Sequence, residues 1–299
     1  MAADIPATSP VFRFAPSPNG ALHLGHAYSA LMNERLAAKT GGLVLLRIEN
    51  LDRTRCKPRF EAAIADDLAW LGLRFPKPPR RQSEHGGDYA AALARLDGRG
   101  LVYPCFCSRS EIARASAGRD PDGAPLYPGT CRALSAAERR DRLARGDKAA
   151  FRLDMRRALE AGPKRLRWME YGEGAAPSPH PAAPELWGDV VLSGRDLAAS
   201  YHLAVTVDDT LQGVTDVVRG RDLLAATAVH RLLQALLGLP EPRYRHHRLV
   251  VDASGTKLSK SRQSVSLAEL RGTGLSPGEV RAALGFGAGA AGGLAVEFS

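Results

Sequence analysis

The chain has 299 residues, enough for one large core or for two or three domains, and 44% of them are hydrophobic, as in ordinary globular proteins. No run of about 18 apolar residues occurs, which excludes a membrane-spanning helix, and the first residues lack the pattern of a secretory signal. A formal net charge of +9 favours a polyanionic partner, with a basic surface that aids solubility as the alternative. Four cysteines do not form a disulfide framework, so we expect a cytoplasmic protein without a membrane partner.

The first hundred residues predict a βαβ unit. Residues 11–15 form a short apolar run, and residues 22–40 then show a helical pattern that ends at two glycines. Residues 43–48 are almost continuously apolar, which is typical of a strand buried on both faces. Strand, helix and strand in this order predict a parallel sheet, and further amphipathic helices are expected at residues 60–71 and 89–96.

The character of the sequence changes after residue 102. A turn-rich stretch is followed by charged helical patterns at residues 138–145 and 152–160. Residues 172–184 are rich in glycine, alanine and proline, as in a mobile loop. The first helical pattern carries a basic patch, which is either a contact for an RNA backbone or a solvated face, formed by Arg139, Arg140, Arg142 and Arg145.

Apolar patterns return near the end of the chain. We expect strands at residues 201–207, 214–218 and 248–251 and a helix at residues 222–237. The whole pattern predicts an α/β fold with a Rossmann-like, doubly wound parallel sheet that an insertion splits. The expected segments are the first half of a nucleotide-binding catalytic domain (1–102), the insertion (103–187), the second catalytic half (188–245) and a short C-terminal segment (246–299).

A phosphate-binding motif is expected at residues 21–26, where the first strand leads into the first helix. The first amides of a helix have no partner within the helix and, together with the helix dipole, favour an anion. Gly25 lets a ligand approach the backbone, and His23 and His26 lie on one helical face, from which both can donate to phosphate oxygens. The alternative is two ordinary histidines at the start of a helix.

A second motif, KLSKS, places Lys257 and Lys260 in a loop directly after a predicted strand. Two lysines and two serines can surround a triphosphate, whereas a solvated basic loop is the alternative for the pentapeptide alone. In an open α/β sheet both motifs lie at the carboxyl ends of strands, where ligands bind. Their combination therefore predicts a nucleotide site.

The two motifs are similar to the signatures of class I aminoacyl-tRNA synthetases: RFAPSPNGALHLGH resembles the first and KLSKS the second. RIENLD, YHLAVTVDD and GVTDVVRG resemble segments of the glutamyl-type enzymes. The resemblance implies that a substrate carboxylate attacks the α-phosphorus of ATP, while fixed donors and Mg²⁺ stabilise charge on the phosphate oxygens. It assigns catalytic roles to His23, His26, Lys257 and Lys260, and ATP binding to His23, Gly25, His26 and Lys260.

The same resemblance implies a glutamate pocket, which needs cations for two carboxylates and an anion for the ammonium group. Arg13 and Arg219 offer guanidinium groups, and Glu49 can accept from the ammonium group. The residues implied around the amino acid are Arg13, Ala15, Ser17, Glu49, Tyr201 and Arg219. The alternatives are a structural ion pair between Arg13 and Glu49 and a core role for Tyr201.

Cys105, Cys107 and Cys131 lie close together in the sequence. Thiolates are good zinc ligands, but small buried thiols explain the same residues. A structural zinc site needs a fourth ligand, for which Tyr127 is a candidate. The resemblance implies one structural Zn²⁺ per chain, because short glutamyl-type enzymes hold zinc in a CxC…YxxxC site; residues 118–125 resemble an inserted loop in that pattern.

Two departures from the full-length glutamyl enzymes resemble a truncated group, the glutamyl-Q tRNA(Asp) synthetases. Only a short segment follows residue 261, so no anticodon-binding domain is expected, and Val205 stands in YHLAV where full-length enzymes usually have asparagine. The resemblance implies a monomer that activates glutamate without tRNA and transfers it to queuosine in the anticodon loop of tRNA(Asp). Two alternatives remain open, a minimal glutamyl-tRNA synthetase that charges tRNA(Glu) and a catalytically silent, zinc-containing RNA-binding module.

Overall fold

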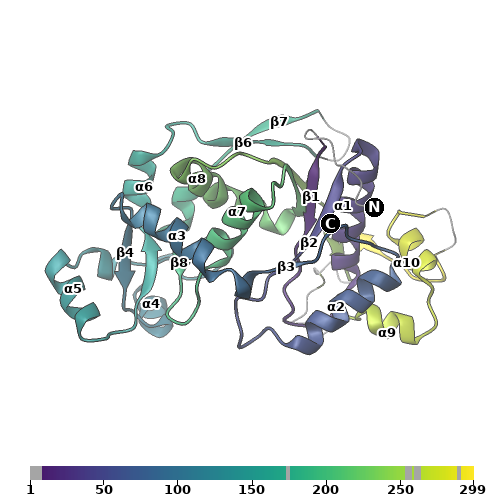
Figure 1. The fold of residues 1–299 in the computed structure, drawn as a ribbon, viewed down its shortest axis with the longest axis horizontal. Coiled ribbons are helices and arrows are strands. Elements are labelled where there is room, and N and C mark those ends of the chain that lie inside the picture. The colour runs from purple at the N-terminus through teal and green to yellow at the C-terminus, as the bar shows by residue number, and fades with distance from the viewer. Residues whose placement is uncertain (1–8, 173–175, 253–257, 259–263, 288–290) are drawn as a thin grey trace.

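The computed structural model describes residues 9–172, 176–252, 258, 264–287 and 291–299, so Lys257 and Lys260 lie outside the described residues (Figure 1). In these ranges, no helix is both long enough and apolar enough to cross a membrane. The α-helices are α1 (Leu24–Thr40), α2 (Pro58–Trp70), α3 (Gly86–Asp97), α4 (Arg109–Ala115), α5 (Ala136–Ala144), α6 (Met155–Ala161), α7 (Tyr201–Leu211), α8 (Thr227–Leu237), α9 (Leu267–Gly272) and α10 (Pro277–Ala283). The strands are β1 (Val11–Phe14), β2 (Leu43–Ile48), β3 (Arg80–Arg81), β4 (Val102–Cys105), β5 (Ala150–Leu153), β6 (Arg167–Glu170), β7 (Ser178–Pro181), β8 (Val191–Ser193), β9 (Asp216–Gly220), β10 (Arg243–His247), β11 (Val250–Val251) and β12 (Glu297–Phe298). Short 3₁₀ helices are η1 (Gln82–Glu84), η2 (Thr130–Arg132), η3 (Pro184–Trp187) and η4 (Arg221–Leu223).

A parallel sheet of order β1-β2-β3 begins the fold. Helix α1 connects β1 to β2, so the predicted βαβ unit is confirmed. The helix ends at Gly41, whose φ of 65° lies in the left-handed region that glycine adopts without steric cost. The carboxyl half of β2 is buried, as its continuous apolar pattern predicted.

A second sheet has the order β7-β6-β10-β9, in which β6, β10 and β9 are parallel and β7 is antiparallel. The backbone amide of Thr215 donates to the carbonyl of Val11 at 2.9 Å, which places the start of β9 beside β1. Helix α8 connects β9 to β10. The predicted α/β architecture is therefore confirmed, but its sheets are mixed rather than purely parallel.

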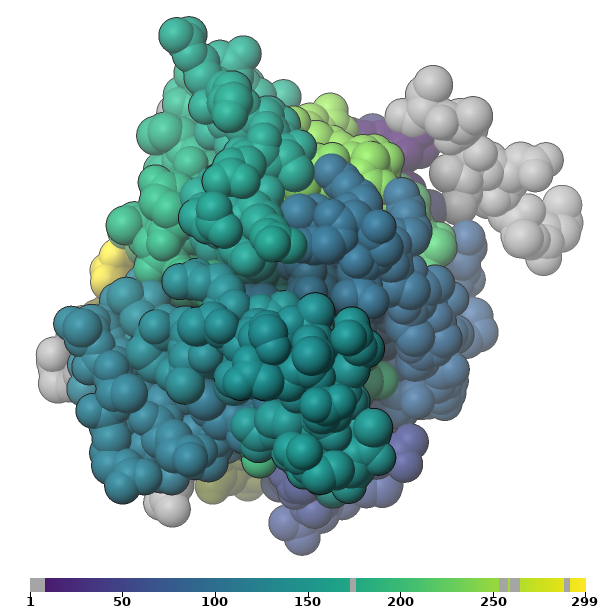
Figure 2. Space-filling view, turned by 90° about the vertical axis from the view of Figure 1, so that its left-hand side faces the viewer, coloured from purple at the N-terminus to yellow at the C-terminus, as the bar shows by residue number. Residues whose placement is uncertain are grey.

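A third sheet, of order β4-β5-β8, is antiparallel and lies far from α9 and α10 (Figure 1). Helices α4 and α5 lie at the same end, which faces the viewer in Figure 2. Strands β6 and β7 also fall within residues 103–187, yet they extend the second sheet, because β6 pairs with β10 and β7 pairs with β6. Residues 103–187 thus contribute strands to two sheets.

Several predicted elements were wrong, and burial explains the largest error. Residues 201–207 form the first part of α7 rather than a strand. This helix is buried on several sides, including six consecutive buried residues after Leu203, so its sequence lacks the polar face that reveals a surface helix. Ser200 marks the true start, since its hydroxyl accepts from the amide of Leu203.

Three smaller errors concern strands. The glycine- and proline-rich stretch 172–184, predicted as a loop, contains β7, and the helical pattern at 152–160 begins in β5 before α6 starts. The strand predicted at 248–251 is only the short β11, whereas the longer β10 was missed because its sequence, RYRHH, is polar.

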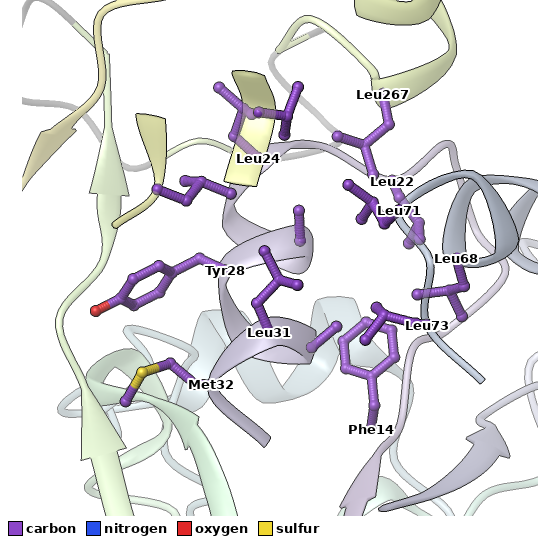
Figure 3. Close-up of a cluster of buried hydrophobic side chains, with 14 of the residues drawn as sticks. Phe14, Leu22, Leu24, Tyr28, Leu31, Met32, Leu68, Leu71, Leu73 and Leu267 are labelled. Atoms are coloured by element: carbon purple, nitrogen blue, oxygen red, sulfur yellow. The ribbon is translucent and has the colours of Figure 1, made fainter. Parts of the chain in front are cut away.

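The hydrophobic core nearest the motifs surrounds α1. Figure 3 shows Leu24 and Leu31 of this helix among Leu68 of α2, Phe14 of β1 and Leu267 of α9. All five side chains are at least nine-tenths buried. Packing from several directions fixes the position of the N-terminus of α1, where the first motif lies.

Candidate active site

A cleft of about 610 Å³ opens at the carboxyl ends of β1, β2 and β9. Nine of the predicted site residues line it, namely Arg13, Ala15, Ser17, His23, Gly25, His26, Glu49, Tyr201 and Arg219. Of the KLSKS motif the structure describes Leu258 alone, and this residue lines the same cleft. The cleft therefore brings together side chains separated by more than 200 positions in the sequence.

The two histidines of the first motif cap α1. The amide of Gly25 donates to Nδ1 of His23 at 3.1 Å, and the amide of His23 donates to Nδ1 of His26 at 3.2 Å. In its neutral form each ring therefore carries its proton on Nε2, where it can donate to a ligand oxygen. The ring centroids lie 3.8 Å apart, so both donors act from one corner of the cleft.

A buried ion network supports the floor of the cleft. Arg13 pairs with Asp209 at 3.1 Å, and Arg47 joins Asp209 at 2.7 Å to Glu49 at 3.4 Å. The structural alternative of an Arg13–Glu49 pair is thus not what forms, because each residue has another partner. Burial raises the pKa of the Glu49 carboxyl, although Arg47 and Arg13 oppose this shift, whereas the two arginines hold the pKa of Asp209 below its usual range against its own burial.

Asp208, the neighbour of Asp209, extends this network to residues of β3, η1 and α3. Its carboxylate accepts from Arg80 at 2.7 Å, from Gln82 at 2.8 Å and from the hydroxyl of Tyr89 at 2.9 Å. Two adjacent carboxylates on α7 therefore tie β1 and β2 to β3 and α3. Sequence reasoning missed both, although an aspartate pair next to an apolar run was a visible signal.

Arg219 is buried with uncharged partners. Its Nη1 donates to the hydroxyl of Tyr201 and to Nδ1 of His230, both at 3.2 Å, and its Nη2 donates to Oγ1 of Thr227 at 2.7 Å. Its Nε donates to Nε2 of His246 at 3.2 Å. Among the residues that the structure describes, no carboxylate forms an ion pair with this guanidinium, which is only 5% exposed.

A buried positive charge without a counter-ion is costly, and it is a strong attractor for a ligand carboxylate. One carboxylate acts on Arg219 through an imidazole: Nδ1 of His246 lies 2.7 Å from the Glu170 carboxylate, and Nε2 of the same ring accepts from Arg219. Burial lowers the pKa of His246 to about 4, although Glu170 opposes this shift, and burial and Arg219 lower the pKa of His230. Both rings are therefore neutral acceptors at neutral pH, and the charge of Arg219 is not cancelled.

Sequence reasoning left His246 out, because adjacent histidines on a strand face opposite sides. The observed register explains its role: His246 of β10 is paired directly with Arg219 of β9. Val205, in contrast, is buried and is not among the described residues that line the cleft. Val205 therefore affects the packing of α7 and does not contact a ligand in the cleft.

Comparison with known proteins gives a matching family description, "tRNA synthetases class I (E and Q), catalytic domain", over residues 11–286. The chain belongs to this family. Among curated relatives of this synthetase, "Glutamyl-Q tRNA(Asp) synthetase" of Rhodobacter capsulatus is 43% identical over 92% of the chain and 99% of that protein. A protein of the same name from Symbiobacterium thermophilum is 41% identical over 89% of the chain and 82% of that protein.

A solved glutamate–tRNA synthetase from Elizabethkingia anophelis superposes on the chain with a TM-score of 0.74 and 25% identity. The superposition covers 92% of the chain and 61% of the Elizabethkingia protein, so the chain spans about three-fifths of that structure's length. The class I synthetase fold is thus shared by sequence family and by structure.

A second cluster in this synthetase can hold a metal ion. The sulfur atoms of Cys105, Cys107 and Cys131 all lie within 4.8 Å of one another, and the hydroxyl of Tyr127 is 3.7 Å from the Cys107 sulfur. A tetrahedral zinc site with bonds of about 2.3 Å separates its sulfur ligands by about 3.8 Å, which is compatible with this spacing. The three sulfur donors therefore fit a thiolate-rich metal site, and the Tyr127 hydroxyl lies beside one of them.

Replacing Glu170 by glutamine tests whether the contact of Glu170 with His246 helps to position Arg219 for glutamate. Glu170 accepts at Oε1 from the amide of His246 and at Oε2 from Nδ1 of His246 and Nε1 of Trp168, whereas glutamine has a single acceptor oxygen. At least one of these donors therefore loses its partner, and the His246 ring that accepts from Nε of Arg219 is held less firmly. We expect the KM for glutamate to rise about tenfold or more, with a smaller change in kcat, in an ATP–pyrophosphate exchange assay. Glu185→Gln, at an exposed position, is the matched control; equal effects in both variants would contradict this role.

Replacing Cys131 by serine tests the metal cluster. We expect bound zinc to fall from about one ion per chain to none and the thermal midpoint to drop by about 5–10 °C, because loss of a structural metal removes folding free energy. Metal content by mass spectrometry and thermal unfolding are the two measurements. Cys56→Ser should keep the metal, since Cys56 lies outside the cluster; zinc-free wild-type protein would contradict the prediction.

Proposed function

We propose that this synthetase activates glutamate with ATP, without RNA, and then transfers the glutamyl group to queuosine in the anticodon loop of tRNA(Asp). The observation that carries the amino-acid assignment is Arg219, a buried cation at the cleft wall that is held only by uncharged partners. The recurrence of the name glutamyl-Q tRNA(Asp) synthetase among relatives 41–43% identical supports the acceptor.

In the proposed pocket, the side-chain carboxylate of glutamate binds Arg219, and Tyr201 adds a hydroxyl beside it. Arg13 offers a second guanidinium, and Glu49 accepts from the ammonium group. Ala15 and Ser17 line the same cleft and bring the backbone close to the amino acid. Glutamine would bring no charge to Arg219, so a pocket of this kind discriminates against it.

In the proposed activation step, an α-carboxylate oxygen of glutamate attacks the α-phosphorus of ATP. The bond to pyrophosphate breaks, and glutamyl-adenylate forms. His23 and His26 donate through Nε2 to phosphate oxygens at the N-terminus of α1, with Gly25 allowing close approach. Lys257 and Lys260 are proposed to bind the pyrophosphate group. Bound Mg²⁺ neutralises phosphate charge during this step.

In the proposed transfer step, a hydroxyl of the queuosine cyclopentene-diol attacks the carbonyl carbon of the adenylate, and AMP leaves. Charging of tRNA(Glu) at its 3′ end is the same ester formation at another hydroxyl. The relative "Glutamate--tRNA ligase 2" of Nitrosococcus oceani is 39% identical over 89% of the chain, and the acceptor experiment below separates the two reactions.

The metal and the domains complete the proposal. Cys105, Cys107, Tyr127 and Cys131 are proposed to hold one structural Zn²⁺, which would fix the loop that contains η2. Residues 1–102 and 188–245 are proposed as the two halves of the catalytic domain, with residues 103–187 on the RNA side. We further propose that the enzyme acts as a monomer in the cytoplasm.

The deciding experiment has two stages. ATP–pyrophosphate exchange with glutamate in the absence of RNA should occur; no exchange would leave the silent RNA-binding module as the better description. Labelled glutamate should then be incorporated into tRNA(Asp) that carries queuosine, and not into tRNA(Asp) without it or into tRNA(Glu). Incorporation at the 3′ end of tRNA(Glu) instead would establish the minimal glutamyl-tRNA synthetase.

A further inference from the structure

A second hollow, of about 360 Å³, lies at the end of the molecule that Figure 2 faces, between β4, η2, α5 and the start of α6. The charged residues that line it are Arg132, Arg139, Arg156, Arg157 and Asp154. Four guanidinium groups around one small space are unusual on a surface where arginines otherwise repel one another. Nothing in the glutamate and ATP chemistry uses this hollow.

The acids next to the hollow already serve other partners. Asp189 is buried and accepts from Nη1 of Arg132 at 2.8 and 3.0 Å, as well as from the amide of Met155. Asp154 caps α6 by accepting from the amide of Arg157 at 3.1 Å, and the nearest guanidinium nitrogen of Arg157 is 3.6 Å away. These acids hold Arg132 and Arg157 in place without filling the hollow.

Arg139 is the guanidinium that the surrounding chain does not neutralise. It lies 5.2 Å from the centre of the Tyr103 ring, and its Nη2 donates to the carbonyl of Arg132 at 2.6 Å. Its Nε is buried without a hydrogen-bond partner, and it forms no ion pair with any described residue. Arg142, one turn further along α5, differs: its Nε donates to Asp147 at 2.8 Å. Among the arginines of α5, Arg139 is therefore the one that lines the hollow without an ion pair to any described residue.

The backbone next to the hollow is shaped for a close guanidinium. Gly129 has a φ of 86°, and a side chain at this position would place its first carbon 2.9 Å from the Nη2 atom of Arg132. The Arg132 guanidinium thus packs directly over Gly129, next to Cys131 of the metal cluster. The glycine at position 129 therefore leaves room for the Arg132 guanidinium at the edge of the hollow.

We propose that this arginine hollow binds a phosphate group of the RNA backbone. The guanidinium fork matches two phosphate oxygens, and the size of the hollow suits one phosphodiester rather than a folded peptide. The inference rests on the proposed function only in taking RNA as the partner. Phosphate contacts of this kind position an RNA without reading its bases, so the hollow would set the orientation of the tRNA toward the cleft.

Salt-dependent binding of tRNA(Asp) is the main test, measured by fluorescence anisotropy with wild type, Arg139→Gln and Arg157→Gln. Each substitution removes one phosphate contact, so the slope of log affinity against log salt should become shallower by about one. Arg140→Gln is the matched control, because Arg140 lies on the same helix but is exposed and does not line the hollow. An equal loss in Arg140→Gln, or no loss in Arg139→Gln and Arg157→Gln, would overturn the proposal.

A direct measurement guards against misfolded variants. In wild-type protein, titration with inorganic phosphate should shift the Nε–H resonance of Arg139, and added tRNA should reverse the phosphate dependence by competition. A site that phosphate fills while tRNA does not compete would be a small-anion site, which overturns the RNA assignment. If ATP–pyrophosphate exchange were absent, the proposed glutamate activation would be wrong, but the difference in tRNA binding between wild type and the hollow variants would remain. Failure of the proposed function and failure of the hollow proposal are therefore distinguishable.

Discussion

Replacing Arg219 by glutamine is expected to reduce kcat/KM for glutamate by about 10²- to 10³-fold in ATP–pyrophosphate exchange. The loss should reside mainly in KM, because removal of one partner from a buried charged pair costs about 2–5 kcal/mol. Glutamine keeps a donor for Tyr201 and Thr227 but brings no charge, so the pocket loses its attraction for a carboxylate. The KM for ATP should change little.

Arg219→Lys separates charge from shape. Lysine restores the charge but cannot donate at once to His230, His246 and Thr227, so we expect only partial recovery of the affinity for glutamate. Thermal unfolding of both variants shows whether the effect is structural. If Arg219→Gln bound glutamate as tightly as wild type, this residue would not be the carboxylate receptor.

Replacing His26 by alanine is expected to lower kcat of the exchange reaction by about 10²- to 10³-fold, as loss of one donor to developing phosphate charge commonly does. The substitution removes Nε2 and also the Nδ1 that accepts from the amide of His23. His26→Asn separates these roles, because its side-chain oxygen can still accept from that amide. If His26→Asn is as stable as wild type but its kcat remains low, the lost activity comes from the missing donor to the phosphate oxygens.

His23 is the poorer choice for this experiment. Its Nδ1 accepts from the amide of Gly25 and so caps α1, and the residue is nine-tenths buried. His23→Ala should therefore lower stability by about 1 kcal/mol, as well as activity. A kcat unaffected by His26→Ala would leave the N-terminus of α1 as a structural cap only.

The sequence was sufficient to predict elements whose pattern is local. The strand β2 is almost continuously apolar, and α1 has a stop signal at Gly41, so the first βαβ unit could be placed correctly. The cleft residues were accessible through short motifs, because the chemistry of phosphate and carboxylate binding restricts which residues can stand there. Their convergence on one cleft was expected, because both motifs were predicted to follow strands and ligands bind at the carboxyl ends of strands in an open α/β sheet.

What the sequence could not predict depends on contacts between distant segments. Asp209, which lies about 200 positions from Arg13 in the sequence, joins Arg13 to Arg47. Neither its buried charge nor its choice of partners produces a periodic pattern in the sequence. His246 reaches Arg219 through the register of β10 with β9, and β10 was hidden by its polar sequence. Such pairings become visible only when the sheet order is known.

Helix α7 also places a constraint on how this pocket can evolve. Tyr201 at its first position contacts Arg219, while Asp208 and Asp209, about two turns later, hold the ion network that supports the floor of the cleft. Insertion of a single residue between them would rotate one contact by about 100° relative to the other. Natural variants with altered amino-acid preference should therefore arise by substitution within a helix of constant length, whereas insertions should collect in exposed loops such as residues 117–125.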